Sequence, residues 1–167
     1  MATVEISLPE PRTVGQLLAD MGGVPAERVR LVPTPGSATE ADAVMAAGDR
    51  RRPVCELIDG VLVEKGVGFN ESALAIRLAL ALGAFALERN LGVVTGEQGL
   101  IRLFPGSMWA PDLAFVAWDR LPGRRRPTAS VPTLAPDLVV EILSASNTPA
   151  EMLRKRRDYF AAGVRLV

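Results

Sequence analysis

The chain has 167 residues, of which 49% are hydrophobic and 23% are charged, and its formal net charge is +0. This length and composition predict a globular protein with a sizeable core, and the neutral charge excludes the strongly basic signature of many nucleic-acid-binding chains. The sequence has no histidine and one cysteine, Cys55, which excludes Ser-His-Asp and Cys-His catalysis, imidazole metal sites and an internal disulfide framework. Acid–base or metal chemistry must therefore use carboxylates, lysine, tyrosine or water.

We divide the chain into an N-terminal accessory segment with short helices, 1–50, and a domain, 51–167. Two capping-box patterns, "TVGQ" (13–16) and "SATE" (37–40), predict helices in the first segment, the second running to about Ala47. The start of the chain shows no signal-peptide pattern, and a single cysteine fits a reducing compartment. We therefore expect a cytoplasmic protein.

The domain opens with a predicted β-hairpin, "VCELIDGVLVEK" (54–65), which turns at Asp59-Gly60. Asn70 is the expected cap of a helix over about 71–89. This helix is apolar almost all round, which favours burial in the core. Its apolar run is broken by Arg77 and is too short to span a bilayer comfortably, so we expect no membrane partner.

Strands are predicted at about 92–104, 111–118 and 137–143, the last two separated by a long loop rich in proline and arginine. The clearest helix follows them. Thr148 is its N-cap and Gly163 its C-terminal stop. "VRLV" then begins another strand, inside which the sequence ends, so we expect the closing strand of the domain to be truncated.

One carboxylate interrupts an apolar strand. Glu141 lies within "PDLVVEILSAS", and burying a lone carboxylate costs several kcal/mol unless it is paired or binds a metal. If this strand neighbours "APDLAFVAW", Asp112 faces Glu141 across one sheet edge. Two adjacent carboxylates repel unless a cation lies between them, and a hard divalent ion prefers oxygen ligands. We hypothesise a metal site, against two alternatives: an arginine partner for Glu141, and a turn role for Asp112.

The basic residues gather in short clusters of the sequence, although the net charge of the chain is +0. Lysine is rare, since 17 of the 19 basic residues are arginine, which draws attention to Lys65 and Lys155. The clusters "GRRRP" and "RKRR" predict phosphate contacts, with a solvated arginine face as the alternative. The arginines expected to contact nucleic acid are Arg124, Arg125, Arg126 and Arg156.

Three segments together, "CELIDGVLVEK", "APDLAFV" and "PDLVVEILSASNTPAEMLRKRRDYFAAGV", resemble the Uma-two family of restriction endonucleases (domain of unknown function 820) in the PD-(D/E)XK nuclease superfamily. The resemblance covers roughly residues 54–167. It implies an α/β fold with an αβββαβ core, whose mixed central sheet is flanked by helices and preceded by a β-hairpin. It also implies hydrolysis of DNA phosphodiester bonds with magnesium or manganese.

The resemblance assigns roles to particular residues. Asp112 and Glu141 would hold the metal ion that activates a water for attack on phosphorus. The superfamily's lysine stands two residues after the acid, where this chain has Leu143, so the standard motif is broken. The family places a lysine on the following helix instead, and Lys155 fills that position. A surface ion pair between Lys155 and Glu151 is the alternative.

Three further residues are candidates. The superfamily has a further acid ahead of the core, and it corresponds to Glu56 or, alternatively, to Glu71. Glu56 would hold a second metal ion or a water bound to the metal. Tyr159 lies one turn beyond Lys155 and is expected to position it.

A second function stays open. The broken lysine spacing and the neutral net charge favour a catalytically inactive nuclease-fold protein that binds nucleic acid or a protein partner. Superfamily nucleases often pair to cut two strands, so the resemblance also allows a homodimer.

Overall fold

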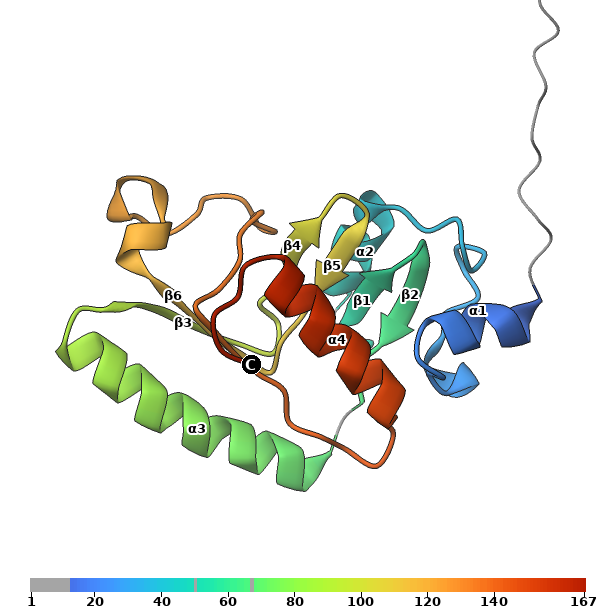
Figure 1. Ribbon diagram of the computed structural model, residues 1–167, viewed down its shortest axis with the longest axis horizontal. Coiled ribbons are helices and arrows are strands. Elements are labelled where there is room, and N and C mark those ends of the chain that lie inside the picture. Colours follow the sequence, from blue (N-terminus) through green and yellow to red (C-terminus); the bar gives the residue numbers. More distant parts are fainter. Residues whose placement is uncertain (1–12, 50, 67) are drawn as a thin grey trace, which may run out of the picture.

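The computed structural model describes residues 13–49, 51–66 and 68–167. Over these residues it contains four α-helices and two antiparallel sheets, which confirms the α/β fold class (Figure 1). The helices are α1 (Val14–Asp20), α2 (Glu40–Gly48), α3 (Phe69–Glu88) and α4 (Pro149–Ala161), with 3₁₀ turns η1 (Ala26–Arg28), η2 (Trp118–Arg120) and η3 (Pro122–Arg124). The strands are β1 (Cys55–Ile58), β2 (Val61–Glu64), β3 (Gly92–Gly96), β4 (Ile101–Phe104), β5 (Ser107–Trp109), β6 (Leu113–Ala117) and β7 (Leu138–Val140).

Side-chain caps fix where the helices begin. Thr13 caps α1 in a capping box with Gln16, and Thr148 caps α4 in the same way with Glu151, both as predicted. The left-handed φ of 95° at Gly163 follows the end of α4, which confirms the predicted stop.

The predicted start of α2 was wrong. Thr39, not Ser37, is the N-cap and forms its capping box with Asp42, so the helix begins at Glu40. Ser37 instead donates its hydroxyl to the carbonyl of Thr34, in the preceding turn. Ser37 and Thr39 are both competent caps with an acid three residues later, but the Glu40 carboxylate binds Arg102 and the backbone N–H of Gly106, whereas Asp42 binds the backbone N–H of Thr39.

The first sheet has the strand order β2-β1-β5-β4. Its β1–β2 hairpin turns at Asp59 and Gly60, whose positive φ values of 49° and 75° confirm the predicted two-residue turn. The side chains of β1 are buried along its whole length. One residue of this strand is Glu56, so the fold encloses a carboxylate.

The second sheet has the order β3-β6-β7 and is antiparallel throughout. The single strand predicted over 92–104 was wrong, because Gly96 ends β3 and the chain enters the other sheet at Ile101. The predicted strand 137–143 is also shorter, ending at Val140. Parallel pairing occurs in isolated bridges, of which one joins Leu138 to Leu166.

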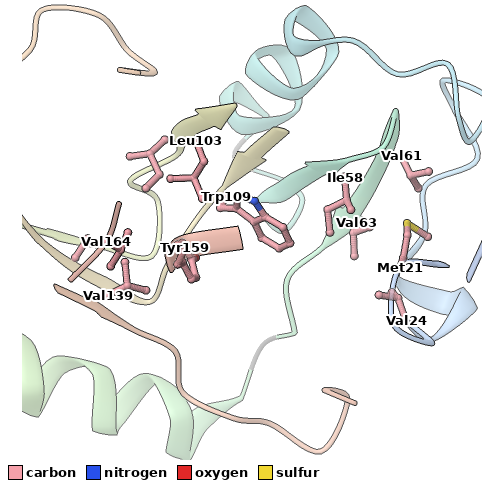
Figure 2. Packing of buried hydrophobic residues seen from close by; sticks show 12 residues of the cluster. Met21, Val24, Ile58, Val61, Val63, Leu103, Trp109, Val139, Tyr159 and Val164 are labelled. Carbon is pink, nitrogen blue, oxygen red and sulfur yellow. The ribbon is translucent and has the colours of Figure 1, made fainter. Parts of the chain in front are cut away.

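The core lies between the sheets and α4. Trp109 of β5 and Tyr159 of α4 are its largest fully buried side chains, and their rings meet at a centroid distance of 6.1 Å (Figure 2). Met21 and Val24, from the segment after α1, pack into the same cluster. α4 is thereby held against both sheets, and its inward face is fixed.

Helix α3 contradicts the prediction of a buried core helix. It packs on β3 through one narrow face, on which Ala86 is buried, while most of its large apolar side chains are exposed. Its N-cap is Gly68, not Asn70. By length and composition alone α3 is long and apolar enough to cross a membrane, and its most apolar stretch is 6% buried.

Candidate active site

A pocket of about 150 Å³ opens where five elements come together. They are the end of β2, the start of α3, the start of β6, the end of β7, and α4. Its wall is made mainly of charged and polar side chains. Its charged members are Arg28, Lys65, Glu71, Glu97, Asp112, Glu141 and Lys155.

Asp112 and Glu141 lie opposite each other at one edge of the second sheet. Leu113 pairs with Val140 in the antiparallel ladder, so Asp112 just precedes a paired position and Glu141 just follows it. The Oδ2 atom of Asp112 accepts a hydrogen bond of 2.6 Å from the backbone N–H of Ile142. The expected neighbouring strands are therefore confirmed, and both carboxylates line the same pocket.

Lys155 joins Glu141 to a second acid. Its Nζ donates to Glu56 Oε1 at 2.8 Å and to Glu141 Oε2 at 3.3 Å. The side chains of Lys155 and Glu56 are 2% and 0% exposed, so this ion pair is enclosed. Tyr159 donates its hydroxyl to Glu141 Oε1 at 2.6 Å. Tyr159 thus orients Glu141, and the structure shows no bond from it to Lys155.

Glu56 is held from one side. Its Oε1 also accepts the backbone N–H of Ala110 at 3.2 Å, whereas its Oε2 is buried without a hydrogen-bond partner among the described residues. An orphaned carboxylate oxygen beside a pocket is costly unless a water or a cation completes it.

Burial and charge shift the pKa values of this cluster. Burial raises the pKa of the Glu141 carboxyl above its ordinary 4.5, and the nearby Lys155 ammonium opposes that shift. For Lys155 itself burial lowers the pKa, but the charges of Glu56 and Glu141 outweigh it, so the pKa lies above the usual lysine value. Burial and the charge of Glu141 raise the pKa of Tyr159. The raised pKa favours the charged form of Lys155 at neutral pH.

Lys65 is a site residue to which sequence reasoning gave no role. It follows β2, and its Nζ donates to Asp112 Oδ1 at 2.7 Å and to the carbonyl of Ala110. Its side chain is 13% exposed in the pocket wall, against 2% for Lys155. The rarity of lysine was the sequence signal, but the contact joins residues 47 positions apart.

Arg28 lines the pocket beside this cluster and is held by several hydrogen bonds. Its guanidinium binds both oxygens of Glu151 at 3.0 and 2.9 Å, and its Nε donates to the carbonyl of Glu64 at 2.8 Å. Burial alone raises the pKa of Glu151, but Arg28 outweighs it and the net shift is downward. The alternative of a surface pair between Glu151 and Lys155 was wrong, because each binds a different buried partner.

The donor set fits a divalent cation of the magnesium type. Magnesium usually takes one or two carboxylates and completes its shell with water and substrate phosphate. Asp112 and Glu141 supply such a pair, and each already contacts an ammonium group, so the pocket favours positive charge at both. In the described ranges no group of three or more His, Cys, Asp or Glu side chains forms a cage. The residues fit an ion shared with substrate.

Of the other candidate residues, Glu71 lies in the pocket wall and the four arginines lie outside it. Glu71 lines the pocket from the first turn of α3. Arg156, expected to contact nucleic acid, is exposed on α4, whose buried positions are Glu151, Lys155 and Tyr159. The three arginines of the loop after β6 do not line the pocket, and the first of them pairs with Asp119 at 3.0 Å; they are Arg124, Arg125 and Arg126. Their contact with nucleic acid stays a prediction.

Comparisons with known proteins give a family model and solved structures that resemble this chain. A family model described as "Uma2: Putative restriction endonuclease" matches residues 29–167, which confirms the resemblance seen in the motifs and extends it toward the N-terminus. A crystal structure of "a putative nuclease belonging to DUF820" from Anabaena variabilis ATCC 29413 shares 20% sequence identity, with a TM-score of 0.59. The alignment covers 69% of this chain and 66% of that one, just under two thirds, and shows a common fold. No curated protein matches.

Proposed function

The chain belongs to the Uma2 family, and from this membership we propose that it is a metal-dependent endonuclease that hydrolyses phosphodiester bonds of DNA. The observation that carries the proposal is the pair Asp112 and Glu141, opposite each other on adjacent strands in one pocket. Two lysines flank the pair, and a nuclease site needs such positive groups to receive a phosphodiester.

Asp112 and Glu141 would hold a magnesium or manganese ion between their facing oxygens. When bound, such an ion neutralises charge on the phosphate and lowers the pKa of an attacking water. The chain prepares both ligands: Ile142 fixes one oxygen of Asp112, and Tyr159 fixes one oxygen of Glu141. The remaining oxygen of each carboxylate is bonded to a lysine ammonium, that of Asp112 to Lys65 and that of Glu141 to Lys155, so the ion would share these oxygens with the two lysines.

The two lysines have different roles in this proposal. Lys155 is enclosed between Glu56 and Glu141 and stays protonated, so it orients Glu141 and offsets its charge. Lys65 is the more accessible ammonium, and two of its three N–H groups are used by Asp112 and Ala110. The third would donate to a phosphate oxygen and stabilise charge in the transition state.

The charge of the cluster also supports a cation. Three carboxylates, from Glu56, Asp112 and Glu141, are matched here by two ammonium groups, which leaves one excess negative charge. A divalent ion together with one phosphodiester charge would neutralise it. Glu71 and Glu97 also line the pocket, so an anion would enter together with the metal ion rather than alone.

The test is nicking of supercoiled plasmid by the purified protein with magnesium or manganese. We expect metal-dependent cutting that is lost in Asp112→Asn and in Glu141→Gln. Asp119→Asn, a matched change at an exposed carboxylate outside the pocket, should keep full activity. Cutting that survives both pocket variants, or that the control also loses, would refute the assignment.

A second function is favoured by one observation. Leu143 stands where the superfamily has a lysine, and it is exposed. If Lys155 and Lys65 do not replace that lysine, the protein would bind DNA without cutting it. Gel-shift binding of DNA with no nicking, by protein whose circular dichroism shows an intact fold, would favour this alternative.

A further inference from the structure

Helix α3 carries an exposed apolar stripe that the nuclease site does not use. Its large members are Phe69, Ile76, Leu80 and Leu87, which are 88%, 60%, 69% and 81% exposed. Figure 1 shows α3 along one edge of the molecule, with the second sheet on one side of it. α3 packs on β3 through another face, on which Ala86 is buried, and the four large stripe residues stay exposed among the described residues.

The spacing of the stripe is that of a helix–helix seam. Ala73 and Gly83 complete it, so its members recur at alternating intervals of four and three residues. A helix with 3.6 residues per turn keeps such positions in one line, and this 3-4 repeat is the pattern that a second helix fills. A bilayer-spanning role is disfavoured, because Arg77 lies at mid-helix beside the stripe.

The pattern of large and small residues in the stripe is symmetric about its centre. About Leu78, Phe69 mirrors Leu87 and Ile76 mirrors Leu80, while the small residues Ala73 and Gly83 mirror each other. An antiparallel copy of the same helix therefore sets large residues against large ones and small against small. A two-fold interface requires this self-complementarity, and an unrelated partner does not.

We propose that two copies of this chain form a homodimer by antiparallel pairing of their α3 helices along this stripe. Ile76 of each copy packs against Leu80 of the other beside the two-fold axis. The small residues let the helix backbones approach, and the pocket-facing residue Glu71 stays outside the seam. The pairing does not depend on the proposed catalytic function.

The area of the seam sets the expected strength. A fully buried large apolar side chain removes roughly 60–120 Å² from water. Eight of them, four from each copy, give on the order of 500–1,000 Å² before the small residues are counted. Specific interfaces begin at about 1,200 Å² in total, so we expect a reversible dimer with a dissociation constant on the order of micromolar.

Sedimentation velocity of the purified protein across a wide concentration range tests the dimer. We expect a concentration-dependent monomer–dimer equilibrium that Leu80→Lys shifts at least tenfold toward monomer. Leu74→Lys changes an exposed leucine on the other side of the same helix and should leave the equilibrium within about twofold of the native protein. A monomer at all concentrations, or equal effects of the two variants, would overturn the proposal.

Cross-linking tests the direction of the helices. Ile76→Cys and Leu80→Cys proteins, mixed and oxidised, should form a disulfide-linked dimer, whereas either alone should give little, because antiparallel pairing joins position 76 to position 80. Efficient cross-linking of each variant with itself would indicate parallel pairing and overturn the geometry. Binding to phosphatidylcholine vesicles by a protein that remains monomeric would assign the stripe to a lipid surface instead.

Discussion

Replacing Lys155 by methionine tests the charge arrangement of the pocket independently of catalysis. Methionine fills a similar volume but leaves Glu56 and Glu141 buried without their shared ammonium. Removing one partner of a buried ion pair costs about 3–5 kcal/mol. In a domain of this size each kcal/mol shifts Tm by about 2–4 °C, so we expect Tm to fall by roughly 6–20 °C at neutral pH.

The pH dependence of this loss follows from the sign of the pKa shifts. The pKa of Lys155 is raised in the folded protein, so its contribution is fully present below the ordinary lysine pKa of 10.5. In the variant Glu141 loses the charge that lowers its pKa, so that pKa rises further above 4.5. The folded variant then takes up a proton before the unfolded chain does as pH falls, and part of the deficit disappears toward pH 5.

Urea unfolding followed by circular dichroism at pH 8 and at pH 5 measures both effects. Arg156→Met on the exposed side of α4 is the matched control and should stay within about 0.5 kcal/mol of the native protein. Adding Glu56→Gln to Lys155→Met should recover part of the loss. A Lys155→Met protein as stable as the control at pH 8, with no pH dependence, would refute the reasoning.

Three other outcomes are expected. Gly22 and Gly23 both have positive φ, but a Cβ on Gly22 would lie 2.5 Å from backbone of α4, whereas Gly23 faces open space. In differential scanning fluorimetry Gly23→Ala should cost about 1–2 kcal/mol and Gly22→Ala a further 1–3 kcal/mol or so; equal losses would contradict the contact. Tyr159→Phe removes the bond to Glu141, so an NMR titration should show a higher Glu141 pKa than in the native protein, and an unchanged pKa would refute the contact. Burial raises the pKa of Cys55 to about 11 from 9.0, so Ellman's reagent at pH 8 should react slowly with the native protein and fast in urea; rapid native reaction would show that the thiol is accessible.

The local sequence predicted the local structure well. Thr13 and Thr148 begin their helices and the hairpin turns at Asp59-Gly60, as expected, while the metal role of Glu141 stays a prediction. These features depend on residues a few positions apart, whose chemistry is legible in one dimension. The family was also recognisable from its motifs, whereas the boundary at residue 50 and the catalytic roles remain predictions.

Only the tertiary structure decided which charges meet and which surfaces are covered. Lys155 and Glu56 are 99 positions apart. Lys65 follows β2 of the first sheet and Asp112 precedes β6 of the second, so their contact forms only when the two sheets pack together. The apolar pattern of α3 was equally misleading, because periodicity reveals which faces are apolar but not whether another element covers them. The hairpin turn and the caps of α1 and α4 were therefore set by the local sequence, whereas the predicted caps of α2 and α3 were wrong. The lysine–carboxylate network and the free stripe of α3 depend on strand pairing and packing between segments that no local pattern relates.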